Sequence, residues 1–331
     1  MSLVNQTPFM VQDAVIPDHT GREMVVAIVK ASYRLSPSGG LLRAEQQEPV
    51  RLGDVCHRED DPKSSIRYPS ELCTAKVGTD VVVVGDAISP KPVTVMDIAV
   101  VVRELTVPLR VHGERVFYRG VTGVAIGPAA AFLEKPIVYE KAYGGATADG
   151  AVMEMRNPSG VGVARSQKDL VDTLAPQIEH PARPHKSGSD AFAPVGYGAL
   201  WSYWSPRKDH AGTMDDAWVR DRMPIMPADF DLRANNVAHP SLVFDPPLHA
   251  GEGVLVHGMS ASGQLVFTLP ALGVLLTARF DGRGSVELRP TIDLVLVEPG
   301  EGKVSLVMRG AFPLGRGREK LREIRAEIEA A

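Results

Sequence analysis

The placement of proline is the feature that most constrains how this chain can fold. Half of its 26 prolines fall between residues 127 and 250, at positions 128, 136, 158, 176, 181, 184, 194, 206, 224, 227, 240, 246 and 247. Each proline removes a backbone donor and fixes φ, so long helices and strands are not expected there. A long irregular segment in a compact domain is either packed by its own side chains or used for binding. We therefore expect a loop-rich insert that carries or supports a binding surface.

Two short helices are expected inside this insert, at Gln167–Leu174 and at Asp215–Asp221. Asp215 is suited to cap the second helix, because its carboxylate can accept hydrogen bonds from amides two or three residues further on. The rest of the insert follows neither a helix period nor a strand period.

Strand patterns lie on both sides of the insert, as runs rich in β-branched residues that are separated by turn signals. Before the insert they predict strands at Met24–Leu35, Thr79–Gly85, Thr94–Leu105, Val107–Val111, Arg115–Tyr118 and Thr122–Ile126. After the insert they predict strands at Gly253–Met259, Gly263–Leu269, Val274–Phe280, Ser285–Leu288, Thr291–Val297 and Val304–Met308. The stretch Tyr68–Asp80 is interpreted as a linking loop with a helical turn at Ser70–Thr74.

The expected fold is a single, mainly β domain over residues 1–331. Its β regions, 1–126 and 251–314, join in an antiparallel, sandwich-like body, and the insert 127–250 wraps over that body. Residues 315–331 are predicted to form a C-terminal helix, because Leu321, Ile324 and Ile328 recur at helix spacing over Glu319–Ala330. Docking of this helix on the body is favoured, and binding of a partner by its apolar stripe stays open.

Composition excludes several classes of protein. The net charge is −4 and the two signs are well mixed, which argues against a nucleic-acid partner. No apolar run approaches the roughly 20 residues of a membrane span, and Met1–Met10 lacks the pattern of a signal peptide. Free thiols are favoured at Cys56 and Cys73, although one disulfide is possible. A cytoplasmic protein is expected.

Acidic residues gather in and just after the insert, at Glu140, Asp215, Asp216, Asp229, Asp231 and Glu252. A pair of carboxylates could hydrolyse a glycoside, and a cluster with His249 could hold a divalent cation. The alternative, which is favoured, is that they bond to loop amides and to nearby arginines. Gly144–Gly145 lacks the lysine and helix of a phosphate-binding loop, and the chain offers no recognisable nucleophile. No catalytic residue, metal or cofactor is therefore predicted.

Large aromatic side chains of the insert are the strongest candidates for recognition. Aromatic residues bury much area and can either anchor a partner or form the insert's own core. Arginines such as Arg207 can bond loop carbonyls across that core. The predicted surface, divided between core and face, consists of Tyr139, Glu140, Tyr143, Trp204, Arg207, Trp218, Asp229 and Asp231.

A series of short motifs runs through most of the chain. It begins with V-V-A-I-V-K-A-S-Y at Val25–Tyr33 and ends with F-T-L-P at Phe267–Pro270. Between them lie D-D-P-K-S-S-I-R-Y-P-S-E-L (Asp60–Leu72), K-V-G-T-D-V-V-V-V-G (Lys76–Gly85), Y-E-K-A-Y-G-G (Tyr139–Gly145), R-N-P-S-G-V-G (Arg156–Gly162), P-V-G-Y-G (Pro194–Gly198), W-S-P-R (Trp204–Arg207), A-G-T-M-D-D-A-W (Ala211–Trp218) and P-A-D-F-D-L-R-A-N-N (Pro227–Asn236). In this order the motifs resemble the domain of unknown function 2169 family, which is found beside type VI secretion spike genes.

The resemblance implies a non-enzymatic adaptor or chaperone in the bacterial cytoplasm. Members of the family look like proteins that help mount a toxic effector, or a PAAR-type tip, on the VgrG spike before firing. The expected partners are therefore a secretion effector and the VgrG or PAAR spike proteins. Two alternatives stay open: a carbohydrate-active or metal-dependent hydrolase that uses the carboxylates of the insert, and a structural component of the secreted spike.

Overall fold

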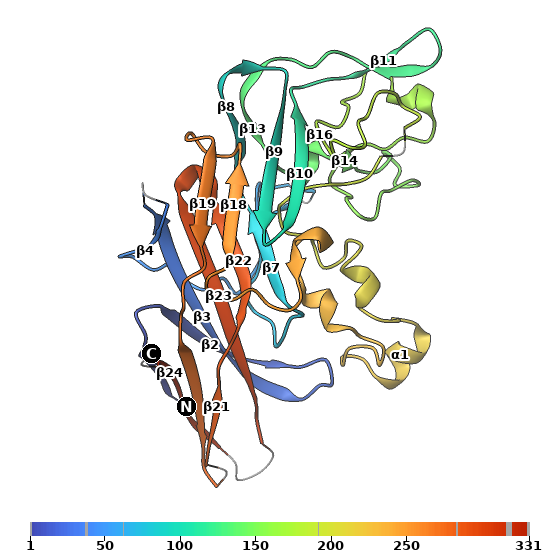
Figure 1. Ribbon diagram of the computed structural model, residues 1–331. Helices are drawn as coiled ribbons and strands as arrows, with labels where there is room; N and C mark the ends of the chain where they lie inside the picture. The colour runs from blue at the N-terminus through green and yellow to red at the C-terminus, as the bar shows by residue number, and fades with distance from the viewer. Residues whose placement is uncertain are drawn as a thin grey trace.

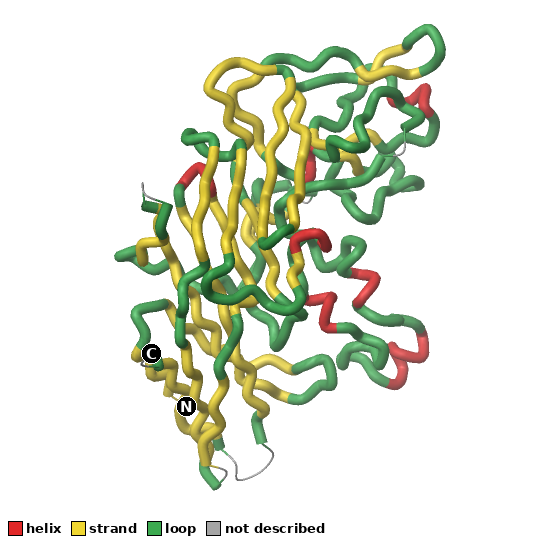
Figure 2. The backbone as a smooth tube through the Cα atoms, in the orientation of Figure 1, coloured by secondary structure: helices red, strands yellow, loops and turns green. Residues whose placement is uncertain are grey.

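The computed structural model describes residues 2–36, 39–61, 63–190, 192–282, 284–315 and 320–329. Within these ranges the chain is mainly β, and its three main sheets combine strands that lie far apart in the sequence (Figure 1). Helical turns are short and lie mostly beside the sheets (Figure 2).

The first sheet has seven strands in the described part of the chain. They follow the order β17-β7-β22-β23-β3-β2, with β4 paired to β3. Neighbours are antiparallel except for β7 and β22, which run parallel. Residues 25–31 of β3 are fully buried, which explains their nearly continuous apolar run. The strands span Val243–Phe244 (β17), Thr79–Val83 (β7), Ile292–Glu298 (β22), Lys303–Pro313 (β23), Glu23–Leu35 (β3), Met10–Pro17 (β2) and Leu41–Arg43 (β4).

The second sheet has five strands over the same ranges, in the order β16-β10-β9-β18-β19, and every pair is antiparallel. Alternate residues of β9 (Ile98, Val100 and Val102) are buried, so one face of this sheet is turned to the core. The strands span Ile178–Glu179 (β16), Leu105–His112 (β10), Val95–Val102 (β9), Gly253–His257 (β18) and Gln264–Thr268 (β19).

The third sheet has four described strands, in the order β1-β24-β20-β21. β1 runs parallel to β24, whereas the other neighbours are antiparallel. The strands span Ser2–Gln6 (β1), Leu321–Ile328 (β24), Val274–Phe280 (β20) and Gly284–Leu288 (β21).

One contiguous cluster of buried apolar side chains joins the three sheets. Val29 of the first sheet, Val100 of the second and Leu276 of the third all belong to it. Full burial of each such side chain contributes about 1.5–3 kcal/mol, so this shared core dominates the stability of the fold.

Strands from the two ends of the chain interleave, as the sequence predicted. β22 and β23 lie between β7 and β3, and β18 adds to β9. Each strand predicted on either side of the insert overlaps an observed strand, including the hairpin of β11 (Phe117–Arg119) and β12 (Val124–Ile126). The sequence did not predict the remaining strands of the two flanks, which are β1, β2, β4, β5 (Val55–Cys56), β6 (Ile66–Tyr68) and β8 (Asp86–Val93).

The prediction of a C-terminal helix is wrong. Its described part, residues 320–329, contains strand β24, which pairs with β20 on one side and with β1 on the other. Ile324 and Ala326 are buried at strand spacing, whereas Leu321, three residues before Ile324, fits the helix period only. Two neighbouring strands satisfy the backbone, and this tertiary pairing outweighs the helix propensity of the segment.

The insert is more tightly integrated with the sheets than a simple covering loop. Three of its strands extend the body: β13 (Phe132–Pro136) pairs with β8, β16 with β10, and β17 with β7. Its other strands are β14 (Tyr143–Gly144) and β15 (Val161–Gly162), which pair with each other. The expected loop-rich character is confirmed for the segments that connect these strands.

Short helical turns punctuate these segments. α1 is an α-helix at Asp216–Asp221, and the Asp215 carboxylate accepts a hydrogen bond from the Trp218 amide, so this prediction and its cap are confirmed. At Gln167–Leu174 the structure instead has one 3₁₀ turn, η2, over Gln167–Leu170. No helical turn forms at the described residues Ser70–Thr74. The other 3₁₀ turns are η1 (Tyr139–Lys141), η3 (Lys208–His210), η4 (Leu232–Asn235), η5 (Pro240–Leu242) and η6 (Pro299–Glu301).

Asp80 of β7 fixes the end of the insert to the first sheet. Its buried carboxylate accepts hydrogen bonds from the backbone amides of Val237 (3.0 Å) and Ala238 (3.3 Å) and from Nδ2 of Asn236 (3.1 Å). Nζ of Lys76 completes the set at 2.7 Å, and that ammonium is also buried. One negative charge thus satisfies donors from two distant parts of the chain.

Replacement of Asp80 by asparagine is expected to lower the free energy of unfolding by about 3 kcal/mol, because it leaves the Lys76 ammonium buried without its counter-charge. Urea unfolding of wild type and of Asp80→Asn measures the change. The matched control is Asp60→Asn on the exposed surface, where the change should stay within about 0.5 kcal/mol. Equal effects of the two substitutions would contradict an anchoring role for Asp80.

Candidate functional site

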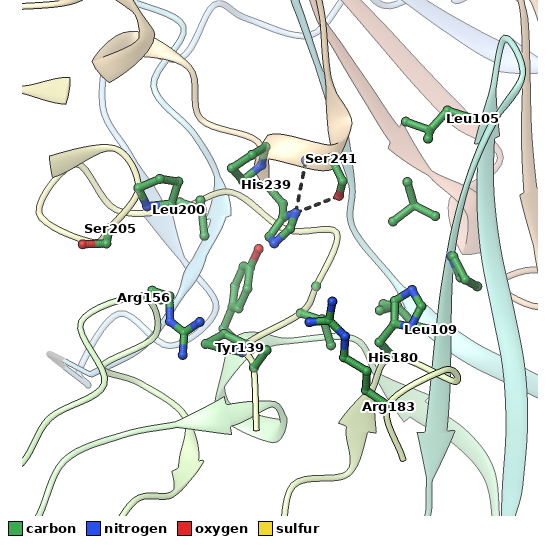
Figure 3. A pocket seen from close by; sticks show the side chains of 18 of the residues that line it. Leu105, Leu109, Tyr139, Arg156, His180, Arg183, Leu200, Ser205, His239 and Ser241 are labelled. Carbon is green, nitrogen blue, oxygen red and sulfur yellow. Dashed lines mark hydrogen bonds between the residues drawn. The ribbon is translucent and has the colours of Figure 1, made fainter. Parts of the chain in front are cut away.

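A cavity of about 500 Å³ lies between β10 and the insert (Figure 3). We call it the β10 cavity. Its volume falls in the range of pockets that enclose small ligands or short peptide stretches. Its lining consists of Leu105, Thr106, Val107, Pro108, Leu109, Tyr139, Arg156, His180, Arg183, His185, Ala193, Pro194, Val195, Gly196, Leu200, Ser205, Pro206, Asp209, His239, Pro240 and Ser241.

One wall of the β10 cavity is an open edge of the second sheet. β10 pairs with β9 along its whole length, from Leu105 to His112, but β16 pairs with it only at Arg110 and Val111. If this register continued, Pro181 would lie opposite Pro108. Neither proline has an N–H to donate, so the pairing ends there. The chain turns away after β16, and no described strand covers Leu105–Leu109 on this side.

The second wall is formed by the aromatic core of the insert. The Tyr139 ring packs edge-on against Trp204, with ring centroids 5.5 Å apart, and both side chains are buried. Gly196 allows this packing, because a Cβ there would lie only 2.8 Å from Cε1 of Tyr139. Leu200 completes this small cluster and reaches the β10 cavity.

The third wall carries His239 and Ser241, directly after the residues that Asp80 fixes. Nδ1 of His239 accepts a hydrogen bond from the Ser241 amide at 3.3 Å and lies 2.7 Å from Ser241 Oγ (Figure 3). Burial lowers the pKa of His239, so the ring is neutral at pH 7. Because Nδ1 is the acceptor, the proton resides on Nε2. That N–H has no partner in the described ranges.

Two guanidinium groups and one carboxylate are found among the described residues that line the β10 cavity. Figure 3 shows the guanidinium of Arg183 between Tyr139 and Leu109, and within the described residues it makes no hydrogen bond or ion pair. Arg156 is bonded to Glu154 at 2.7 and 2.6 Å. Asp209 is the single carboxylate in the lining, and it accepts a hydrogen bond from Ser205 Oγ. Because Glu154 already neutralises Arg156, the Arg183 guanidinium is the group that offers an unpaired positive charge to a ligand.

A buried charge cluster supports the side of the β10 cavity near β16. Glu179 accepts hydrogen bonds from Arg115 and His112, both at 2.8 Å, and from the His185 amide at 3.0 Å. Burial raises the pKa of Glu179, but these hydrogen bonds outweigh burial and lower it to about 2. Burial lowers the pKa of His185 to about 4, although the nearby Glu179 carboxylate acts in the opposite direction.

The predicted surface does not assemble at one place. Tyr139 lines the β10 cavity, whereas Trp204 is 0% exposed and belongs to the core. Tyr143 is half-buried and stacks on Phe192, and Nε1 of Trp218 donates to the Ile225 carbonyl. Arg207 bonds the carbonyl oxygens of loop residues at 2.6 and 3.0 Å, as expected for a structural arginine.

The carboxylates of the insert accept hydrogen bonds from loop amides, hydroxyls and an arginine. Glu140 accepts from the amide and the hydroxyl of Ser65, Asp229 accepts from Thr213, and Asp231 accepts from Arg233. Glu252 is paired with Arg103. In the described part of the chain no three His, Cys, Asp or Glu side chains are grouped so that they could hold a metal ion.

Two of the motifs are tied together by Asn157. Its buried Nδ2 donates to the carbonyl oxygens of Tyr139 (2.8 Å) and Tyr143 (2.9 Å). The main-chain carbonyl of Asn157 accepts a hydrogen bond from the Gly145 amide at 2.7 Å. Gly145 has a φ of +93°, and a Cβ there would lie 2.3 Å from the Gly160 carbonyl oxygen. The Y-G-G and N-P-S-G sequences therefore pack backbone against backbone.

Sequence reasoning missed most of the β10 cavity. Arg183 lies in the Glu179–His185 loop, and no sequence pattern singled it out. The open edge of β10 could have been suspected from Pro108 and Pro181, but their opposition depends on the register of two distant strands. Cys56 and Cys73 are free thiols, the state favoured from the sequence.

Comparison with known proteins gives a family and no closer relative. A family model described as an uncharacterized protein conserved in bacteria (DUF2169) matches residues 20–309. No curated protein and no solved structure matches the chain. Among the described residues, no helix has the length and apolar character needed to cross a membrane.

The pKa of His185 predicts a loss of stability in mild acid. Its folded pKa, about 4, lies below the ordinary value of 6.5, so the unfolded chain binds more protons between these values. The free energy of unfolding should therefore fall as pH drops through this window, by on the order of 2 kcal/mol from His185. Urea unfolding across this window should show a shallower slope for His185→Gln.

The control for this measurement is His257→Gln, which replaces an exposed histidine of β18. This variant should keep the slope of the wild type. Glu179 contributes separately at lower pH. Its folded pKa lies below the ordinary value of 4.5, so Glu179 lowers the free energy of unfolding only when the pH drops below about 4.5. If the free energy of unfolding of His185→Gln depends on pH as steeply as that of the wild type, the lowered pKa of His185 is contradicted.

Proposed function

This chain belongs to the DUF2169 family, and we propose that it is a non-enzymatic adaptor that binds a partner protein through the β10 cavity. The partner proposed is a type VI secretion effector or a PAAR-type tip, which the adaptor would help to load onto the VgrG spike. It would act in the bacterial cytoplasm before export.

The observation that carries this proposal is the concave, largely apolar site that the insert forms against an open sheet edge. Recognition sites for proteins combine an apolar centre with a polar rim, and this cavity has Leu109, Val195 and Leu200 in its lining together with Arg183 and His239. A preformed site of this kind loses little conformational entropy on binding.

The connection to secretion is supported by the resemblance that the ordered series of motifs carries. The structure gives these motifs a physical role in this chain. Asn157, Gly145 and Gly196 shape the insert, and Asp80 anchors it to the first sheet. The motifs would therefore preserve the shape of a recognition surface, which is what an adaptor needs.

The hydrolase alternative receives no support from the geometry. Glu140, Asp229 and Asp231 each accept hydrogen bonds from neighbouring loop groups. A glycoside hydrolase needs two carboxylates facing each other across an open cleft, and the β10 cavity has only Asp209 in its lining.

Affinity purification of the tagged protein from its native bacterium tests the proposal. We expect an effector or spike protein encoded by a neighbouring gene to copurify, and deletion of the adaptor to stop secretion of that effector. Ala193→Trp fills part of the β10 cavity and should reduce the copurified partner by about tenfold or more.

Val121→Trp serves as the matched control, because Val121 is fully exposed in the turn between β11 and β12. It should leave the complex intact. The adaptor role is contradicted if wild type copurifies with no partner and secretion survives the deletion. Release of this protein into the medium with the spike would instead favour the structural-component alternative.

A further inference from the structure

We propose that the β10 cavity binds an extended, acidic segment of the partner, which pairs with β10 along Leu105–Leu109 and places a carboxylate against Arg183. This inference rests on the proposed adaptor function and adds the chemistry and conformation of the bound segment. Three independent features of the cavity support it.

The first feature is the direction of the peptide groups on β10. Val102 and Leu105 pair across the two-residue turn Arg103–Glu104, so these residues exchange backbone hydrogen bonds. Peptide groups alternate along an antiparallel strand, and therefore those of Thr106 and Pro108 point away from β9, towards the cavity. They offer one N–H and two carbonyl oxygens to an added strand.

The second feature is the apolar surface beside this edge. Leu105 and Leu109 both line the cavity, Leu105 with 44% of its surface exposed and Leu109 buried. Side chains of an added strand project alternately to its two faces, so every second residue would reach these apolar groups. An extended segment with apolar residues at alternate positions fits both the edge and the wall.

The third feature is charge. Arg183 has an exposed guanidinium with no partner in the described ranges, and a guanidinium binds a carboxylate through two parallel hydrogen bonds. His239 adds a neutral Nε2–H donor on the opposite wall. Asp209 already accepts a hydrogen bond from Ser205, whereas the Arg183 guanidinium has no partner in the described ranges, so an acidic segment is favoured over a basic one.

Selection from a phage-displayed library of random peptides of about twelve residues, on the purified full-length protein, tests the inference. We expect enrichment of acidic sequences with apolar residues at alternate positions. Synthetic copies should bind Arg183→Glu about tenfold more weakly than wild type or worse. They should bind Arg119→Glu like the wild type, because Arg119 is an equally exposed arginine on β11, outside the cavity.

Amide hydrogen exchange measured by NMR locates the bound peptide. The Thr106 amide should exchange about tenfold more slowly when peptide is present, because it then donates to the added strand. Circular dichroism confirms that both variants are folded. The inference is overturned if no sequence family is enriched, if basic peptides are selected, or if Thr106 exchange is unchanged.

The proposed function can survive a failure of this inference. If wild type and Arg183→Glu copurify equally with an effector or spike protein, the adaptor role stands, whereas the assigned acidic segment is rejected. Sedimentation velocity of the purified protein tests a second copy of the chain as the occupant, and a dimer that Arg183→Glu dissociates would also reject the assignment.

Discussion

The buried carboxylate of Asp80 is the interaction on which the candidate site depends. It accepts hydrogen bonds from Val237 and Ala238 at one end of the insert, and β7 holds it inside the first sheet. The Leu200 amide donates in turn to the Val237 carbonyl, so two walls of the β10 cavity are linked to one charge. Such a carboxylate is costly to bury and is retained where its donors fix a particular geometry.

The same principle explains why a segment so poor in regular structure is well packed. Asn157 bonds the carbonyl oxygens of Tyr139 and Tyr143, and Arg207 bonds those of Leu200 and Ala234. Side chains thus take the place of the sheet ladder in satisfying buried backbone groups. Polar motifs that resemble an active site by composition here form the internal bonding of a scaffold, and the proposed recognition surface is what this scaffold encloses.

Sequence patterns predicted the body of the fold better than its site. Runs such as Thr79–Gly85 have the length and the β-branched content of strands, and the structure has a strand at Thr79–Val83. The C-terminal segment was mispredicted because Leu321, Ile324 and Ile328 suit a helix stripe, while pairing with β1 and β20 decides the outcome. The β10 cavity could not be predicted, since it combines stretches of chain that lie far apart in the sequence and whose proximity depends on long-range anchors.

We propose that the insert holds a partner against the open edge of β10. Photo-crosslinking in the native bacterium tests this most directly, with a photoreactive amino acid at Leu105 and, as control, at the similarly exposed Leu133 of β13. We expect a covalent adduct with an effector or spike protein from position 105 and none from position 133. Adducts from position 133 alone, or from neither position while the complex still copurifies, would contradict it.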